Sequence, residues 1–360
     1  MTGISTYRCC VLAGLLTTAL SGASLAADDW YPLTVNATKV DGSKGQFDYI
    51  PLSASGKASK KWSICSSFPH LKDPVFVSVN YGMVEEARRL GVDLKTYDAG
   101  GYGALANQIS QIENCVAAGA DAVIMVAIAE DGMNNLLMEL KEKGIPVIDA
   151  FNGVNSPNVA ARVLTNPRDQ GFRAGEYLAA QHPAGTQEVK VAWLPGPAGA
   201  GFVTAFDDGF KAGIAGSAVT IVETKNGDLG KEIQSTLVED ILQTHDDLDY
   251  IAGTAVMAEA AVPILKARGI ADKIKLVSVY TTPGVYEYVK NGDVEIADGS
   301  TVTLTARIML DEAVRALEDK IEYTEVYTIG KVYTTESAGS LDLETILAPA
   351  DFAPVFNLSN

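Results

Sequence analysis

The chain has 360 residues, 47% of them hydrophobic and 20% charged, so it can bury a large core and is too long for one small domain. Its formal net charge of −17 argues against nucleic acid as a partner, because phosphate binding requires a clustered positive surface. Two lobes are therefore the expected organisation.

The first 26 residues have the pattern of a secretory signal peptide. Arg8 is the only charged side chain before Asp28, and an apolar run from Cys10 to Leu25 ends in small residues, which predicts cleavage after Ala26. A membrane anchor is the alternative, but Thr, Ser and Gly interrupt the run and it is short. No later stretch of sequence is apolar for long enough to span a bilayer. The mature protein is expected outside the cytoplasm, without membrane insertion.

The next segment, residues 27–60, is rich in Ser, Gly, Lys and Asp and has no clear period, which predicts an extended or partly disordered N-terminal arm. From Trp62 onward, short apolar runs alternate with longer segments of helical periodicity. The apolar runs are WSICSS, VDLKTY, DAVIMVAI, IPVIDAF, VKVAWLPG, VTIVETK, DYIAGTAV, IKLVSVY and VEIADGS. The helical segments are Tyr81–Leu90, Leu105–Ala118, Gly132–Lys143, Gly171–Gln181, Phe202–Ala215, Lys231–Gln243, Ala258–Ala267 and Leu304–Leu317. Apolar strands that alternate with helices predict an α/β fold built on doubly wound parallel sheets.

Two smaller sheets suit the chain length better than one sheet of nine strands. The chain is expected to cross between lobes at VLTNPRDQG, again near Asp298–Thr301, and a third time in the extended stretch EYTEVYTIGKVYT. Residues 61–164 and 300–325 would form the N-terminal lobe. Residues 165–299 and 326–360 would form the C-terminal lobe. Three crossings between two α/β lobes describe a hinged clamshell.

Two glycine-rich turns raise the question of phosphate binding. DAGGYG follows the second strand rather than the first, and Tyr102 places a bulky ring where a pyrophosphate would need open backbone. LPGPAGAGF lies between a strand and a helix, where an anion could bind. Its two prolines remove backbone donors and no Lys or Arg is nearby, so a tight structural turn is favoured.

The sequence contains no motif for catalysis or metal binding. G-x-S-x-G and H-E-x-x-H are absent, and His70, His182 and His245 are scattered without zinc-like spacing. No enzymatic activity and no cofactor are expected.

Removal of the signal peptide leaves Cys65 and Cys115, an even pair in an oxidising compartment. This pair predicts a disulfide, with two buried thiols as the alternative.

Several stretches carry a family resemblance, namely FPHLKDPVFVSVNYGM, GVDLKTYDAGGY, LPGPAGAGF, DYIAGTAVMAEAA, LVSVYTTPGVY and LAPADFAPVF. Through them the chain resembles the type I periplasmic binding proteins of the ribose-binding group over almost its whole mature length. It is most similar to members that bind trimethylamine N-oxide (TMAO) and present it to a membrane histidine kinase. The resemblance implies a periplasmic sensor partner, and the two cysteines also lie where that family carries cysteines.

The same resemblance implies a set of ligand-binding residues. The family's aromatic cage maps onto Phe76, Tyr102 and Tyr280, with Asp73 as the hydrogen-bonding carboxylate. Phe76 replaces a tryptophan of those proteins, which provides the strongest face for a cation–π contact.

The loop TNPRDQGF departs further from the family pattern. Pro167 stands where a second tryptophan is expected, and Arg168 and Asp169 add charges to the same loop. The ligand is therefore expected to be TMAO, a related methylated amine, or a zwitterion that Arg168 contacts.

The residues at the predicted strand ends favour such a ligand over a sugar. Sugar-binding sites need a polar partner for every buried hydroxyl, whereas this chain offers Ala255, Val256 and Tyr280 there. Two alternatives stay open: the substrate-binding component of an ABC transporter for a sugar or another small solute, and an exported enzyme on the same scaffold.

Overall fold

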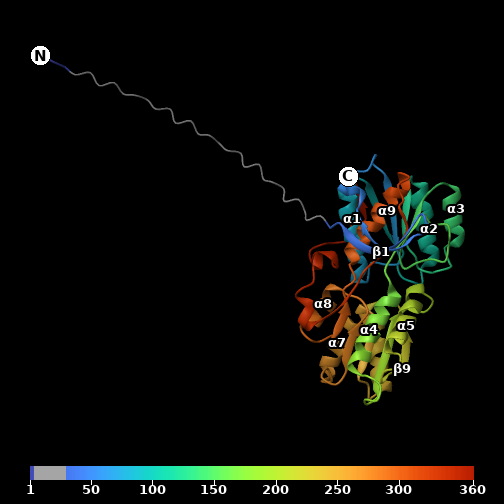
Figure 1. The fold of residues 1–360 in the computed structure, drawn as a ribbon, viewed down its shortest axis with the longest axis vertical. Coiled ribbons are helices and arrows are strands. Elements are labelled where there is room, and N and C mark those ends of the chain that lie inside the picture. The colour runs from blue at the N-terminus through green and yellow to red at the C-terminus, as the bar shows by residue number, and fades with distance from the viewer. Residues whose placement is uncertain (4–29) are drawn as a thin grey trace.

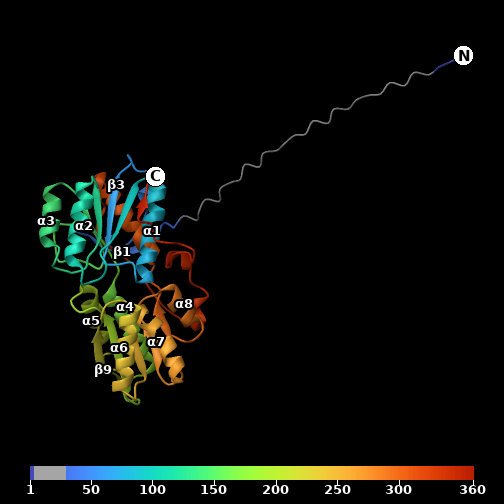
Figure 2. The ribbon, with the colours of Figure 1, turned by 180° about the vertical axis from the view of Figure 1, so that it is seen from behind.

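The computed structural model describes residues 1–3 and 30–360, so residues 4–26 of the predicted signal peptide lie outside the described part. Two lobes, each a sheet covered by helices, lie one beside the other along the long axis (Figures 1 and 2). Among the described residues, no helix is both long and apolar enough to cross a membrane. The two-lobed α/β architecture confirms the predicted fold class.

The first lobe is built on a nine-stranded sheet in the order β15-β4-β3-β5-β6-β7-β13-β1-β2. Its parallel strands are β3 (Ser63–Phe68), β4 (Asp93–Asp98), β5 (Ala122–Val126), β6 (Val147–Phe151), β7 (Ala161–Leu164) and β13 (Tyr323–Thr328). Antiparallel strands β1 (Leu33–Lys39), β2 (Lys44–Tyr49) and β15 (Asn357–Leu358) lie at the edges. The helices of this lobe are α1 (Pro74–Leu90), α2 (Leu105–Ala117), α3 (Asn134–Glu142) and α9 (Val302–Leu317).

Strand β5 shows why the central strands are apolar throughout. Val123 and Met125 belong to the cluster packed under α2 and α3, whereas Ile124 and Val126 belong to the cluster that contains α1 and α9. Successive side chains of a strand point to opposite faces, so a sheet covered by helices on both faces needs apolar residues at every position.

The second lobe has a six-stranded sheet in the order β14-β12-β11-β10-β8-β9. The strands are β8 (Val189–Gly196), β9 (Val219–Asn226), β10 (Tyr250–Gly253), β11 (Lys275–Ser278), β12 (Ile296–Asp298) and β14 (Val332–Thr334). Its helices are α4 (Pro167–Gln181), α5 (Gly201–Ile214), α6 (Lys231–Thr244), α7 (Ala255–Arg268), α8 (Pro283–Lys290) and α10 (Thr335–Ala338). All pairings in this sheet are parallel except that of β12 with β14.

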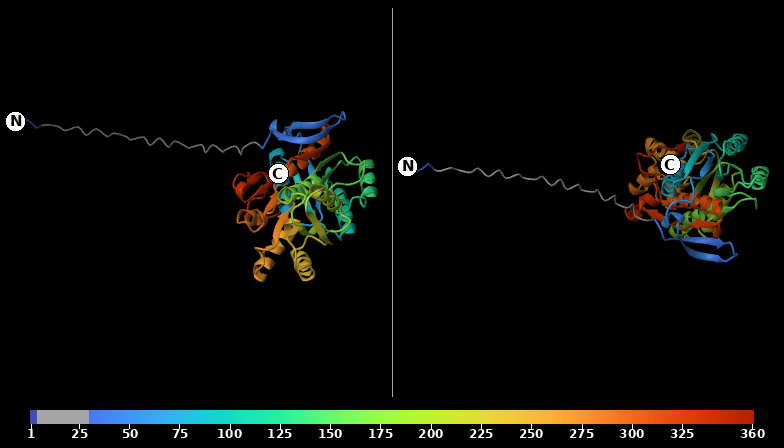
Figure 3. Two further views of the ribbon diagram at one scale, coloured as in Figure 1. Left: turned by 60° about the horizontal axis from the view of Figure 1, so that its bottom comes forward. Right: turned by 90° about the horizontal axis from the view of Figure 1, so that it is seen from above.

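The segment predicted to be an extended arm, residues 27–60, instead contains the hairpin of β1 and β2, which joins the first sheet through β13. Figure 3 shows this hairpin on the outside of the first lobe. Val35, Ala37 and Tyr49 turn inward and are buried. The rest of β2 is mostly exposed, so the segment has no apolar period to recognise.

The chain passes from one sheet to the other between β7 and α4, between β12 and α9, and between β13 and β14. It then crosses a fourth time, because β15 returns to pair with β4 of the first sheet (Figure 1). The predicted assignment of residues 326–360 to the second lobe is corrected at both ends, since 326–328 and 357–358 belong to the first sheet. Two-residue strand β15 is too short to leave a sequence signal.

The predicted disulfide between Cys65 and Cys115 is present and joins β3 to α2. The two Cα atoms are 6.4 Å apart, within the range that a disulfide spans. It ties the centre of the first sheet to the helix that covers it.

Helices α4 and α5 of the second lobe meet along a seam of glycines, two on each helix at a spacing of four. The seam consists of Gly171, Gly175, Gly209 and Gly213. A Cβ atom at Gly209 would overlap the carbonyl oxygen of Arg168, and one at Gly213 would stand 2.7 Å from the backbone nitrogen of Glu176. The two helix backbones are therefore in direct contact, which only glycine permits.

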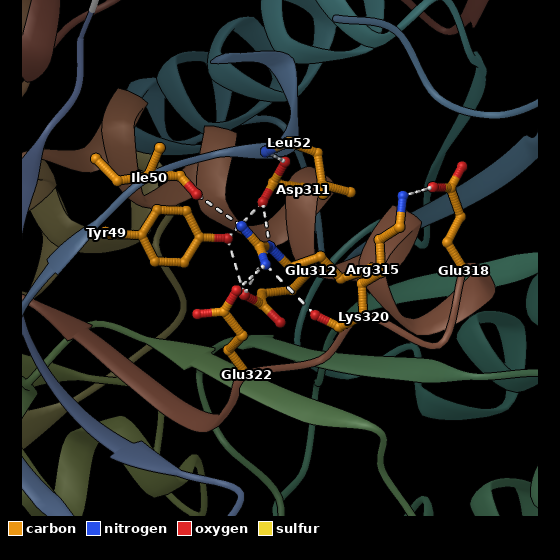
Figure 4. A network of polar contacts seen from close by, with 9 residues as sticks. All are labelled: Tyr49, Ile50, Leu52, Asp311, Glu312, Arg315, Glu318, Lys320 and Glu322. Carbon is orange, nitrogen blue, oxygen red and sulfur yellow. Dashed lines mark hydrogen bonds and ion pairs between the residues drawn. The ribbon is translucent and has the colours of Figure 1, made fainter. Parts of the chain in front are cut away.

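A buried polar network attaches the N-terminal hairpin to α9 (Figure 4). The Tyr49 hydroxyl lies 2.7 Å from Asp311 Oδ2 and 2.8 Å from Glu312 Oε1, and all three residues have no exposed surface. A phenol has one hydrogen, so it donates to one carboxyl group and accepts from the other. Burial first, and then the neighbouring Asp311 carboxylate, raise the pKa of Glu312 to about 8. Glu312 is therefore the protonated partner that donates to Tyr49 near neutral pH.

The cation of the network is Arg315, whose Nε lies 2.7 Å from Asp311 Oδ2. Its Nη2 donates to the carbonyl oxygen of Ile50 at 2.6 Å, and its Nη1 lies 3.2 Å from Glu322 Oε1. The backbone nitrogen of Leu52 donates to Asp311 Oδ1 at 2.7 Å. The loop after the hairpin is thus held by side chains from a helix far along the sequence.

Replacing Glu312 by glutamine is expected to stabilise the protein increasingly as the pH rises. Because the folded-state pKa of Glu312, about 8, lies above its unfolded value, stability is full below about pH 4.5 and is lost as pH rises through about 8. The amide removes this loss and can still donate to Tyr49, so the gain should reach on the order of 5 kcal/mol above about pH 8. Urea unfolding across this pH range would measure it. The matched control is Glu322→Gln, because Glu322 is the exposed partner of Arg315. If Glu312→Gln stabilised the protein equally at low and high pH, Glu312 would not be protonated in the folded protein.

Candidate ligand-binding site

A small cavity of about 30 Å³ lies between the lobes, at the carboxyl ends of strands from both sheets. Ligands of open α/β sheets bind at this end of the strands. The cavity is lined by Asp73, Val75, Phe76, Tyr102, Phe151, Asn152, Thr165, Pro167, Gln170, Phe202, Phe206, Leu229, Tyr280 and Val302. Six of these side chains are aromatic and one is a carboxylate, so the site suits a compact ligand with an apolar surface.

Asp73 is the carboxylate of the cavity, and the start of α1 holds it in place. It follows strand β3 as the N-cap of α1, with Pro74 at the first helical position, and its Oδ1 accepts a hydrogen bond from the backbone nitrogen of Val75 at 3.0 Å. Its Oδ2 accepts from the hydroxyl of Tyr280, which follows β11 of the other lobe. One hydrogen bond therefore links the two lobes at the cavity.

The electrostatics of this pair follow from its burial. Asp73 has no exposed surface, and burial raises its pKa to about 6, although the hydrogen bonds from Tyr280 and Val75 partly oppose the rise. Burial, then the Asp73 charge, raises the pKa of Tyr280 well above its ordinary value. At neutral pH the site holds a mostly ionised carboxylate and a neutral phenol.

Several of the aromatic rings beside the cavity contact one another edge-on or at a tilt. The Phe76 ring centre lies 5.8 Å from that of Phe68 and 5.5 Å from that of Phe151. Tyr102 faces Phe202 across the lobes, with ring centres 5.6 Å apart. Phe151 has a φ of +66°, a left-handed conformation that bulky residues rarely adopt.

Behind the rings, His70 packs edge-on against Phe76 and Tyr102, at 5.5 and 5.4 Å between ring centres. Its Nε2 lies 3.9 Å from Asp228 Oδ1 of the second lobe. Burial lowers the pKa of His70, while Asp228 opposes that change. His70 is therefore neutral near pH 7 and supports the rings of Phe76 and Tyr102 from behind.

The structure brings together five of the seven residues predicted to bind the ligand: Asp73, Phe76, Tyr102, Pro167 and Tyr280 all line the cavity. The other two lie elsewhere. Arg168 is exposed and lines a separate surface hollow beside the cavity. Asp169 accepts a hydrogen bond from Asn166 Nδ2 at 2.7 Å, and Asn166 caps the start of α4.

The cavity also contains residues that the sequence did not single out. Phe151 and Asn152 come at the end of β6, and Phe202 follows the turn after β8. Their position at the end of a predicted strand could have identified them as candidates for the site. Gln170 and Phe206 come from helices α4 and α5, where no such signal exists. Among the described residues, no group of three or more His, Cys, Asp or Glu side chains could hold a metal ion.

Comparison with known proteins places this architecture in a family. Residues 64–322 match the periplasmic binding protein domain. The periplasmic protein TorT of Escherichia coli strain K12 is 34% identical over 300 residues, which cover 83% of this chain and 86% of TorT.

Two solved structures extend the similarity. One is an ABC transporter solute-binding protein from Bradyrhizobium sp. BTAi1 with bound Bis-Tris, with a TM-score of 0.78, 45% identity and coverage of 92% of this chain and 100% of that one. The other is TorT in complex with the TorS sensor domain in the presence of TMAO, with a TM-score of 0.75, 31% identity and coverage of 82% and 100%. The chain therefore belongs to the type I periplasmic binding proteins, a family of ligand binders rather than enzymes, and within it to the TorT-like members.

Proposed function

We propose that this protein binds a small methylated amine, or the N-oxide of one, between its lobes in the periplasm, and presents it to the sensor domain of a membrane histidine kinase. The observation that carries the ligand proposal is the buried Asp73 carboxylate in a cavity walled by six aromatic side chains. Aromatic faces attract a methylated ammonium group through their quadrupoles, and a buried carboxylate adds charge attraction.

The same cavity is poorly suited to a sugar. Apart from the two tyrosine hydroxyls, its polar side chains are Asp73, Asn152, Thr165 and Gln170, and most of their hydrogen-bonding groups are engaged by the protein itself. Every sugar hydroxyl that enters would need a partner there. Among the relatives, TorT was solved in the presence of TMAO, which supports an amine ligand, and the Bradyrhizobium protein was solved with Bis-Tris, which carries hydroxyls beside its tertiary nitrogen.

Binding of a permanent cation is expected to strengthen as the pH rises through the pKa of Asp73, about 6. Only about a tenth of the carboxyl groups are ionised near pH 5, so the affinity for tetramethylammonium should increase about tenfold between about pH 5 and pH 7.5. Isothermal titration calorimetry at the two pH values measures this. Asp73→Asn should bind more weakly and without the pH dependence. An equal rise in affinity in that variant would show that another group attracts the cation.

The partner proposal rests on the likeness to TorT, whose structure was solved with a sensor domain. The purified periplasmic domain of the histidine kinase encoded nearby is expected to co-elute with this protein in gel filtration.

A second candidate function is delivery of the ligand to an ABC transporter, which the 45% identical Bradyrhizobium protein favours. Separate elution from the kinase domain, together with ligand uptake through a nearby permease only when this protein is present, would support that function instead.

A further inference from the structure

Strand β2 ends the first sheet, and within the described chain its outer edge has no neighbouring strand. It pairs only with β1, and Figure 3 shows the hairpin on the outside of the first lobe. Most of its residues are exposed. An exposed edge strand offers a row of unpaired backbone N–H and C=O groups to which another strand can bond.

The hairpin turn shows which backbone groups of β2 point to this open edge. The backbone nitrogen of Lys39 donates to the carbonyl oxygen of Ser43 at 2.8 Å, so these two residues form a hydrogen-bonded pair. Such pairs alternate along an antiparallel ladder, so Gly45 and Phe47 also bond to β1. The alternate residues of β2, whose N–H and C=O groups point away from the sheet, are Lys44, Gln46 and Asp48.

These three residues complement a second copy of themselves. If two β2 strands lie antiparallel with Gln46 opposite Gln46 on a two-fold axis, Lys44 of each copy lies opposite Asp48 of the other. All three residues then meet in hydrogen-bonded pairs, and two cross-strand pairs of opposite charge form. A shift of the register by two residues in either direction breaks both charge pairs, so the sequence of β2 specifies this one alignment.

The other face of the strand fits the same alignment. There, Phe47 of each copy lies opposite Gly45 of the other. The Phe47 ring is only half-buried, with its centre 6.0 Å from that of Tyr323. Gly45 is exposed and has no side chain, so the partner's ring has room above its backbone. Pairing of the two strands would therefore cover apolar surface that the single chain leaves in water.

We propose that this protein forms a symmetric dimer in which β2 pairs antiparallel with β2 of a second copy and joins two nine-stranded sheets edge to edge. One short strand from each copy makes a small interface, so the dissociation constant is expected in the micromolar range. The acidic net charge of each copy opposes association, and salt screens this repulsion.

Sedimentation velocity of the mature protein tests the dimer. Between about 1 and 200 µM, at about 150 mM salt, we expect a reversible monomer–dimer equilibrium. Gln46→Pro removes an N–H group at the centre of the interface but none that bonds to β1, and it should weaken dimerisation by at least about a hundredfold. An unchanged melting temperature would show that this variant is folded.

Charge exchange tests the alignment of the two strands. Lys44→Asp and Asp48→Lys each place like charges opposite one another, so each should weaken self-association about tenfold to a hundredfold. A mixture of the two variants should form a heterodimer more tightly than either variant pairs with itself, because the opposite charges then meet again. The matched control is Lys231→Asp, the same change of charge at an exposed position of α6 in the second lobe, and it should dimerise like the wild type.

A cysteine pair tests the two-fold axis. Gln46→Cys should form a disulfide-linked dimer under mild oxidation, since the two copies of this residue face each other. Asn36 is the neighbour of Gln46 on β1 and is also exposed. Asn36→Cys should not cross-link, because three strand spacings, about 14 Å, would separate its two copies.

Two results would overturn the inference. The first is a protein that stays monomeric at about 200 µM, even if the open edge of β2 pairs with the kinase domain instead. The second is a dimer that survives both Gln46→Pro and the charge changes, which would place the interface elsewhere. Neither result bears on the proposed ligand, because no residue that lines the cavity belongs to the hairpin.

Discussion

Replacing Gly209 by alanine is expected to lower the free energy of unfolding by about 3 kcal/mol, at the upper end for one extra methyl group in a packed interface. The new Cβ would overlap the carbonyl oxygen of Arg168 in the neighbouring helix, so the α4 and α5 backbones would have to separate. Helix propensity acts in the opposite direction, since alanine in a helix is favoured over glycine by about 1 kcal/mol. A destabilised protein in urea unfolding would therefore report the helix contact alone.

The control for this substitution is Gly339→Ala. Gly339 has an ordinary φ of −67° and no neighbouring atom within 4 Å of an added Cβ. Its replacement should change stability by less than about 0.5 kcal/mol. If Gly209→Ala were as stable as this control, the two helices would be able to move apart without cost, and the close seam would not be a constraint on the fold.

Replacing Arg315 by methionine is expected to cost about 3–5 kcal/mol, the range for removing one partner of a buried ion pair. The change leaves Asp311 without its cation and leaves the carbonyl oxygen of Ile50 without its donor. Loss of the positive charge raises the folded-state pKa values of Asp311 and Glu312 further above their unfolded values. Both carboxyl groups then ionise more readily in the unfolded chain, so the free energy of unfolding falls more steeply as the pH rises. The loss should therefore be larger near pH 8 than near pH 5, as denaturant unfolding at both values would show.

Two further variants separate charge from geometry in this network. Arg315→Lys keeps the charge but cannot form the forked contacts, and it should lose less than Arg315→Met. Adding Asp311→Asn to Arg315→Met removes the unpaired charge and should restore part of the stability. A loss that is the same at both pH values and is not relieved in the double variant would mean that Arg315 acts through packing alone.

The parallel cores of both lobes were predictable from the sequence, whereas the edges of the first sheet were not. Strand β5 has apolar side chains for both faces and is recognisable by itself. The hairpin is different because β2 exposes most of its residues and depends on distant partners. Tyr49 reaches its hydrogen-bond partner Asp311 across 262 positions of sequence, and no local pattern records such a contact.

The site was predictable where residues directly follow a strand. Asp73, Tyr102 and Tyr280 come after β3, β4 and β11, and the family resemblance drew attention to them. On helix α4 the direction of each side chain depends on rotation about the axis. Pro167 and Gln170, three residues apart, share the face towards the cavity, while Arg168 lies off that face. The sequence could identify the loop at the start of α4 but not which of its side chains face the cavity. Whether these residues bind a ligand stays a prediction.

The strand order of the first sheet also has a consequence for the order of folding. Within the described chain, β1 pairs with β2 and with β13, and the pairing of Val35 with Thr328 spans 328 − 35 = 293 positions. Strands β3 to β7 find their neighbours within much shorter loops, so we expect them to assemble first, because distant pairings must overcome loop-closure entropy.

Until β13 and β15 arrive, the outer edges of β7 and β4 present unpaired backbone groups to other chains. The hairpin of β1 and β2 comes first in the described sequence and would be the part that docks late. A chain that ends before residue 323 would keep both edges open, and we expect it to be retained by chaperones or to aggregate rather than to accumulate as a smaller binding protein.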